Sequence, residues 1–226
     1  MRRIIIKEDD KKRGCEEAHS DVCEEVAKKK AKTESDVEMS DKASQEGKPA
    51  VSSQATVLLD VCCGTGTIGL CLMSLLRKSN RLSNHYLVGI EMVPEAVEDA
   101  KVNAETNHFK ENECRFVAAK AEDAFRRLSL YLPSSMDLNE ANVIGILDPP
   151  RAGIHEKVVV GCRTLASLKR LIFVSCEPSQ ALKNLTDLCR PSSKKYAGEA
   201  FRLTSITPVD MFPQTKHCEW VIQLDR

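Results

Sequence analysis

The chain has 226 residues, of which 42% are hydrophobic and 29% are charged, and its 33 basic and 33 acidic residues give a formal net charge of zero. A protein that binds nucleic acid by neutralising phosphates alone usually has a basic surplus, so any such contact here needs a local patch or a further region. The ten cysteines include no C-x-x-C pair, which excludes common zinc spacings and the disulfide framework of a small secreted protein. We therefore expect no metal site and a reducing compartment.

The first residues carry no secretion or membrane signal. Residues 1–6 contain only three consecutive isoleucines, too few for the apolar core of a signal peptide, and acidic residues follow at once. No apolar stretch reaches the length that spans a membrane. The expected location is the cytosol or the nucleus, without membrane attachment.

The composition divides the chain into two parts. Residues 1–54 are dominated by Lys, Glu, Asp, Ser and Ala and show no sustained apolar period after Ile6. Such a segment buries too little apolar surface to offset the entropy of ordering it, so we expect it to be disordered. Residues 55–226, roughly 170 residues, are enough for one folded domain with a sizeable core.

From residue 55 onward, apolar runs of strand length alternate with helical patterns. Strands are expected at 55–62, 85–91, 114–118, 143–147 and 171–174. Helices are expected at 68–77, 94–107, 121–132, 155–168 and 179–189, although three adjacent valines and a glycine weaken the fourth. Short connections between alternating strands and helices predict a parallel sheet with helices on both faces.

The last part of the chain breaks this alternation. Residues 201–209 and 220–224 are strand-like, and the stretch between them is too short for a crossover helix. They should pair as an antiparallel hairpin at the sheet edge. Five parallel units closed by such a hairpin resemble the class I S-adenosylmethionine-dependent methyltransferase fold, a Rossmann-like α/β fold, whereas plain dinucleotide-binding domains usually continue with a parallel strand.

A glycine-rich turn joins the first strand to the first helix. Gly64, Gly66 and Gly69 satisfy G-x-G-x-x-G, and Glu91 follows about twenty residues later, where an acid can accept hydrogen bonds from ribose hydroxyls. This pattern alone fits NAD as well as S-adenosylmethionine. Asp60, just before the turn, can supply negative charge for a methionine ammonium group, and together with the hairpin it favours S-adenosylmethionine. A dehydrogenase-like NAD enzyme and a structural turn without ligand are the alternatives.

Three further residues follow strands near the expected crevice. Asp148 precedes two prolines and could contact a ligand or cap the next helix. Cys176 ends a strand just before a helix, whose N-terminus favours a thiolate, although the neighbouring Glu177 opposes this. Glu219 precedes the last strand and could equally be a surface acid. Most other cysteines of the domain are expected to be small core residues: Cys62, Cys63, Cys71, Cys114, Cys162 and Cys189.

Five motifs in one order resemble a known family. They are DVCCGTGTIG, IEMVPEAVEDAKVNA, ILDPPRAG, VSCEP and DMFPQTKHCE, and the similarity runs nearly continuously over residues 57–226. The chain resembles the RNA (uracil-5-)-methyltransferases, which implies that residues 55–226 form a methyltransferase catalytic domain. Residues 1–54 lie outside the resemblance.

The resemblance implies a role for each candidate residue. The nucleophile would be Cys176 and the proton-abstracting base Glu219. The S-adenosylmethionine pocket would be formed by Glu91, Asp148, Cys62, Gly64, Gly66 and Thr67. The implied substrate is a tRNA uridine in the T loop, and the reaction needs no metal. We expect a monomer.

The chemistry explains why one thiol and one carboxylate are needed. C5 of uracil is a poor nucleophile toward a methyl sulfonium, and attack of the Cys176 thiolate on C6 makes C5 electron-rich. After methylation, Glu219 removes the C5 proton and the thiolate is eliminated. The target base must leave its stack to enter such a site.

Two departures from the family qualify this expectation. Family members carry RNA-binding domains and a glutamine-containing segment before the first strand, whereas this chain has the charged segment 1–54 there. The family usually has Asn where this chain has Glu177, and an acid beside a thiolate disfavours the attacking form. The alternative function is therefore a catalytically weak methyltransferase-fold module with a binding or regulatory role.

Overall fold

The computed structural model describes residues 54–226. Residues 1–53, nearly all of the segment expected to be disordered, lie outside the described residues. The elements in chain order are β1 (Thr56–Val61), α1 (Thr67–Lys78), β2 (His85–Glu91), α2 (Pro94–Thr106), β3 (Cys114–Ala118), α3 (Ala121–Ala124), the 3-10 helix η1 (Phe125–Tyr131), β4 (Asn142–Leu147), α4 (Glu156–Thr164), β5 (Leu168–Ser175), α5 (Pro178–Cys189), β6 (Arg202–Val209) and β7 (Glu219–Asp225).

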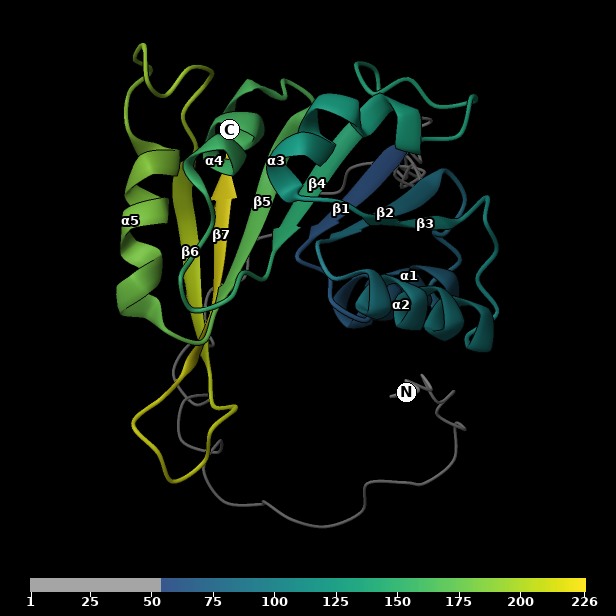
Figure 1. Cartoon of the computed structure of the whole chain (residues 1–226), viewed down its shortest axis with the longest axis horizontal. Helices are drawn as coiled ribbons and strands as arrows, with labels where there is room; N and C mark the ends of the chain where they lie inside the picture. The colour runs from purple at the N-terminus through teal and green to yellow at the C-terminus, as the bar shows by residue number, and fades with distance from the viewer. Residues whose placement is uncertain (1–53) are drawn as a thin grey trace, which may run out of the picture. The chain divides into compact units, whose positions relative to one another are not determined.

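The strands form one seven-stranded sheet in the order β3-β2-β1-β4-β5-β7-β6 (Figure 1). Strands β1 to β5 pair in parallel, and β7 runs antiparallel to both of its neighbours. The strand order reverses between β1 and β4, which run parallel, and at such a point a parallel sheet opens a crevice at the carboxyl ends of its strands. The predicted α/β class, the parallel units and the terminal antiparallel hairpin are confirmed.

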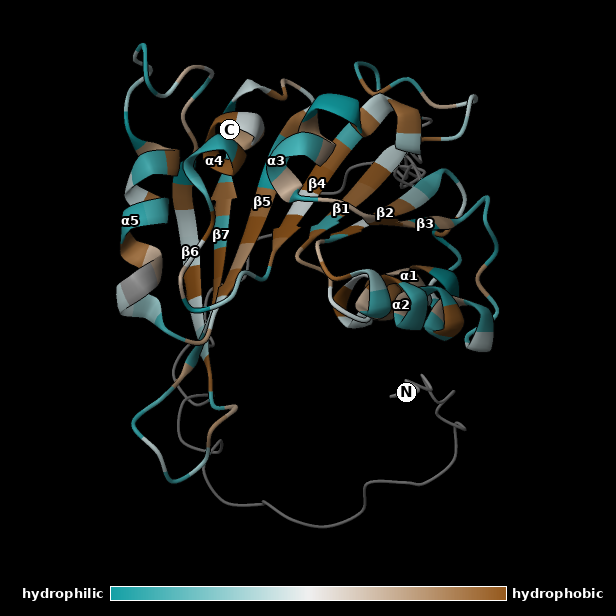
Figure 2. Cartoon of the chain, in the orientation of Figure 1, coloured by the Kyte–Doolittle hydropathy of each residue, from teal (hydrophilic) through white to brown (hydrophobic). Residues whose placement is uncertain are grey.

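Two apolar cores cover the two faces of this sheet. Helices α1 and α2 pack on β1, β2 and β3, and their buried residues form one cluster. Elements α3, η1, α4 and α5 contribute to a larger second cluster around β1, β4, β5 and β7. Hydrophobic residues accordingly concentrate on the central strands (Figure 2). This follows from strands that are apolar on both faces, since both must be covered.

Two predicted helices differ from the structure. The predicted helix 121–132 is one α-helical turn, Ala121–Ala124, followed by the 3-10 helix Phe125–Tyr131. Leu132 is extended, as expected for a residue before a proline, and the chain tightens ahead of it. The predicted helix 155–168 ends at Thr164, and the last positions instead lead into a longer β5.

The longer β5 has a clear cause. Lys169 and Arg170, near the start of β5, are polar and hid the strand in the sequence, yet Arg170 pairs with Asp225 of β7 in the sheet register. The Arg170 guanidinium also donates to the Asp225 carboxylate at 2.6 Å. Cross-strand pairing with β7 therefore extends β5 beyond its apolar core. Among residues 54–226, no helix has the length and apolarity to cross a membrane.

Candidate cofactor and catalytic site

The glycine-rich turn places three alternate residues in the left-handed region of backbone conformation. Cys62, Gly64 and Gly66 have φ values of 62°, 53° and 79°. A Cβ on Gly66 would lie 2.9 Å from the Phe116 ring, so that position needs glycine for both reasons. A Cβ on Gly64 would meet nothing within 4 Å. The turn is therefore packed against the sheet at Gly66 and open at Gly64.

Glu91 ties this turn to the end of β2. Its Oε2 accepts the Gly64 N–H at 3.1 Å, and its Oε1 accepts the N–H groups of Met92 at 2.7 Å and Val93 at 2.9 Å. Three backbone N–H donors thus fix the Glu91 carboxylate at the carboxyl end of β2. This is the position at which an acid in such folds contacts a nucleoside ribose.

Asp60 lies fully buried beneath the turn. Its Oδ2 accepts the Gly69 N–H of α1 at 3.0 Å, while Oδ1 has no hydrogen-bond partner among the described residues. Burial raises the pKa of Asp60 to about 7; the Gly69 hydrogen bond opposes this rise, and the charge of Asp148 adds to it. A buried carboxyl oxygen without a partner is unusual in a folded protein.

A cleft of about 620 Å³ opens beside the turn, at the carboxyl ends of β1, β2, β3 and β4. Of the predicted cofactor residues, Cys62, Glu91 and Asp148 line it. Its other lining residues are Ile90, Met92, Val93, Ala119, Lys120, Ala121, Glu122, Pro150, Gly153, Ile154, His155 and Val158. Its volume is in the range of small-molecule sites.

The remaining predicted cofactor residues surround the cleft without lining it. Gly64 is bonded to Glu91, Asp60 supports α1 from below, and Gly66 begins that helix as its N-cap. Thr67 is exposed in the first turn of α1, with its hydroxyl 3.4 Å from that of Thr65.

Several lining residues were missed in the sequence. They follow the strands directly, as Met92 follows β2 and Lys120 follows β3, and this position was the signal that could have found them. His155 also lines the cleft, and its Nδ1 accepts the Lys157 N–H at 3.2 Å at the start of α4. Met92 and Val93 are 64% and 45% exposed, an uncommon exposure for apolar side chains at a folded site.

The register of β5 and β7 brings Cys176 and Glu219 to one edge of the sheet. Ser175 and Trp220 form the last pair of the antiparallel ladder, so Cys176 directly follows the ladder on one chain segment and Glu219 directly precedes it on the other. Glu219 is the first residue of β7 and pairs with Val209 of β6. These two predicted catalytic residues, more than forty positions apart in the chain, therefore lie at the same end of two adjacent strands.

Charge coupling links this pair to the cleft. Burial raises the pKa of Glu219, and the negative charge of Asp148 raises it further. Burial also raises the pKa of Cys62 to about 11, with Glu91 and Asp148 contributing. The Oε1 atom of Glu219 is buried and has no hydrogen-bond partner in residues 54–226. Asp148, whose own pKa is raised by burial, thus acts on both the cleft and Glu219.

The residue after Cys176 has its side chain held locally. The Ser179 hydroxyl donates to Glu177 Oε1 at 2.6 Å, and the Glu177 N–H donates to the Ser175 hydroxyl at 3.3 Å. Glu177 is the N-cap residue of α5, but its side chain makes no capping hydrogen bond. Cys176 is a free, half-buried thiol.

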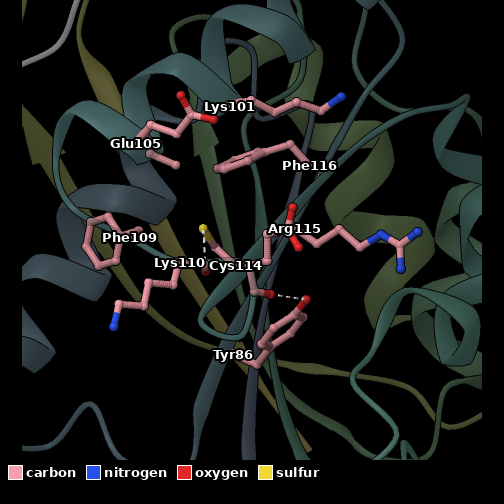
Figure 3. A pocket seen from close by; sticks show the side chains of 10 residues that line it. Tyr86, Lys101, Glu105, Phe109, Lys110, Cys114, Arg115 and Phe116 are labelled. Carbon is pink, nitrogen blue, oxygen red and sulfur yellow. Dashed lines mark hydrogen bonds between the residues drawn. The ribbon is translucent and has the colours of Figure 1, made fainter.

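A second hollow of about 530 Å³ lies at the β3 edge, near the amino ends of β2 and β3 (Figure 3). Its residues are Tyr86, Lys101, Ala104, Glu105, Phe109, Lys110, Glu111, Cys114, Arg115 and Phe116. The Tyr86 hydroxyl donates to the Glu111 carbonyl at 3.2 Å. The hollow contains none of the predicted site residues. Within the described part of the chain, no cluster of three or more His, Cys, Asp or Glu side chains is placed to hold a metal.

Comparison with known proteins assigns the family. A model described as a methyltransferase domain matches residues 52–220. The chain belongs to this methyltransferase domain family. A methyltransferase from Streptococcus mutans described as S-adenosylmethionine-dependent has a similar fold, with a TM-score of 0.53 and 12% identity over 77% of this chain and 46% of that protein.

Two curated relatives are more similar in sequence. This methyltransferase domain is 45% identical to the human tRNA (uracil-5-)-methyltransferase homolog A over 171 residues, which are 76% of this chain and 25% of that protein. It is 38% identical to the zebrafish (Danio rerio) tRNA (uracil-5-)-methyltransferase homolog B over 75% of this chain and 33% of that protein. The chain thus spans between a quarter and a third of the length of these relatives.

Proposed function

We propose that this methyltransferase domain transfers a methyl group from S-adenosylmethionine to C5 of a uridine in RNA, with a T-loop uridine of tRNA as the expected target. The observation that carries the proposal is the β5–β7 pairing, whose last pair, Ser175 with Trp220, leaves the neighbouring Cys176 and Glu219 at one edge of the sheet. This chemistry needs one thiol and one carboxylate at one substrate ring. The names of the two tRNA (uracil-5-)-methyltransferase relatives support the same reaction.

The residues around the cleft fit S-adenosylmethionine. Glu91 is positioned to accept hydrogen bonds from the ribose, and the exposed Met92 and Val93 offer an apolar surface for the adenine ring. The open side of Gly64 leaves room for close backbone approach. Asp148, which lines the cleft, is an acid that can accept a cationic methionine group, while Asp60 lies buried beneath the turn. The family match favours this cofactor over NAD.

In the proposed reaction, the Cys176 thiolate attacks C6 of the uracil, and the ring electrons move to C5 and O4 as an enolate. S-adenosylmethionine, when bound, supplies an electrophilic methyl group that C5 takes. Glu219 then removes the C5 proton, the C5–C6 double bond forms again, and the C6–S bond breaks to release the thiolate. The raised pKa of Glu219 suits this role, because a stronger base removes the proton more readily.

A second candidate function is a domain that binds the cofactor but is catalytically weak alone. The zero net charge of the chain favours this alternative, because RNA binding by phosphate neutralisation needs a local excess of cations. Such a module would bind S-adenosylmethionine without transferring the methyl group, and the methyl-transfer test described next distinguishes the two functions.

The test is methyl transfer from radiolabelled S-adenosylmethionine to a uridine-containing RNA. Wild type should label the RNA, while Cys176→Ala and Glu219→Gln should not turn over. Cys71→Ala, which removes another half-buried thiol in α1, is the matched control and should retain activity. Cofactor binding that persists in every variant, with no labelling even by wild type, would favour the catalytically weak module.

A further inference from the structure

The segment between β6 and β7, residues 210–218, extends past the carboxyl edge of the sheet (Figure 1). We call it the 210–218 loop. It begins and ends at the paired residues Val209 and Glu219, so its base adjoins the proposed catalytic carboxylate. The Cys218 thiol donates to the Val209 carbonyl at 3.5 Å and closes the base of the loop. Any group on this loop is therefore near the edge at which the substrate base must enter.

The 210–218 loop is ordered by one threonine. The Thr215 hydroxyl donates to the Phe212 carbonyl at 2.8 Å and accepts the His217 N–H at 3.2 Å. The Thr215 N–H also donates to the Phe212 carbonyl at 3.2 Å. Gln214 adopts a φ of 65°, which gives the tight turn between them. A hydroxyl with two partners thus fixes the backbone at both ring-bearing residues.

This arrangement holds two flat rings together on the loop. The Phe212 and His217 ring centroids are 6.3 Å apart with an interplanar angle of 77°, an edge-to-face pair. Phe212 is half-buried and supports the pair, whereas His217 is exposed. The exposed imidazole of His217 is therefore held beside a half-buried ring.

A cation of the loop points in the same direction. The 210–218 loop contains Lys216 and His217, and its one acid is Asp210 at the first position. Lys216 is exposed and has no ion pair with the residues that the structure describes. A free ammonium beside an exposed ring is the combination that single-stranded nucleic acid recognises, through phosphate contact and base stacking. The loop provides a local cation that the neutral chain as a whole does not.

We propose that the 210–218 loop is a contact surface for single-stranded RNA next to the target uridine. His217, supported by Phe212, stacks on a neighbouring base, and Lys216 contacts a phosphate. The occupant is a nucleic acid strand because the loop joins an exposed ring to a cation that has no ion pair within residues 54–226, and the base of the loop adjoins Glu219. This inference rests on the proposed function and names residues that read the strand around the reacting base. A flipped base leaves its neighbours unstacked, so a stacking partner there stabilises the opened strand.

The test measures binding of a short fluorescent single-stranded RNA with a central uridine to the full chain, by anisotropy. His217→Ala should weaken binding about 5- to 30-fold, the effect of losing one stacked base. Lys216→Ala should weaken it less and should lower the slope of log affinity against log salt by about 0.7. Thr215→Val should show part of the His217 loss, and Thr215→Ser should restore binding. Lys169→Ala, at the amino end of β5, is the matched cationic control and should bind like wild type.

Two outcomes separate this inference from the proposed function. If wild type methylates the RNA and the His217, Lys216 and Lys169 variants all bind it like wild type, the role of the loop is overturned and the proposed function stands. If wild type neither binds nor methylates RNA, both fail together. The affinity for S-adenosylmethionine and the melting temperature should stay at wild-type values in all loop variants. If a loop variant loses cofactor affinity or melting temperature together with RNA binding, the residue has a structural role and the inference is overturned.

Discussion

Asp60 gives the sharpest physical prediction because its carboxyl group is buried with one oxygen lacking a partner. Burial raises its pKa from the ordinary 3.8 to about 7, so the folded state holds the proton more tightly than the unfolded state. The sign follows directly. The stabilisation from Asp60 is fully present below its ordinary pKa and is lost as the pH rises through about 7.

The size of this effect follows from about 1.4 kcal/mol for each pH unit over which only the unfolded state has lost the proton. Between about pH 5 and about pH 8, Asp60 alone should lower the free energy of unfolding by about 2.5 kcal/mol. Asp60→Asn cannot ionise and should lack this loss. The free energy of unfolding of the variant, measured relative to wild type, should therefore rise by about 2.5 kcal/mol from the lower to the higher pH.

The assay is urea unfolding of wild type and Asp60→Asn near these two pH values, without cofactor. Comparing the two proteins cancels the titration of the groups that do not interact with Asp60. Asp123→Asn, at an exposed position in the first turn of α3, is the matched control and should follow wild type. If the free energy of unfolding of Asp60→Asn changes with pH as much as that of wild type, Asp60 is ionised in the folded protein and the reasoning fails.

Three further predictions concern the site. The kcat/KM of methyl transfer should rise with pH through a midpoint above the ordinary range of a glutamate, because burial and Asp148 raise the pKa of Glu219; a midpoint at or below that range would contradict its assignment as the base. Gly66→Ala should lower the free energy of unfolding by about 2 kcal/mol or more, from left-handed strain plus contact with a ring, whereas Gly64→Ala should cost about 1 kcal/mol, and equal losses in thermal melts would refute the difference. Glu177→Asn should speed methyl transfer several-fold at neutral pH by removing a negative charge beside the nucleophile; an unchanged rate would count against this.

The sequence predicted the sheet because its strands are apolar on both faces and end at glycines, prolines or acids. The turn from Gly64 to Gly69 and the acid at Glu91 were visible in the same way, since they depend on local backbone geometry. The antiparallel hairpin followed from the absence of room for a helix between residues 209 and 219. These features are local, so that a short window of sequence contains their cause.

Features that depend on distant contacts were not visible. Lys169 and Arg170 near the start of β5 are polar, and pairing with β4 and with Asp225 of β7 makes them part of a strand. The lack of a partner for Asp60 Oδ1 depends on how α1 packs over β1. The pairing of Ser175 with Trp220, which places Cys176 and Glu219 at one edge, also joins segments far apart in the chain. Sequence suggested Cys176 and Glu219 separately, and the fold was needed to bring them to one edge.

The most direct test of the account is a denaturing gel of the protein after incubation with S-adenosylmethionine and RNA that carries 5-fluorouridine at the target position. The fluorine at C5 cannot be removed by Glu219, so wild type should form a complex with RNA that survives denaturation. Cys176→Ala should form none, and Cys71→Ala should form it like wild type. A stable complex in Cys176→Ala, or none in a wild-type protein that methylates ordinary uridine, would contradict the covalent mechanism.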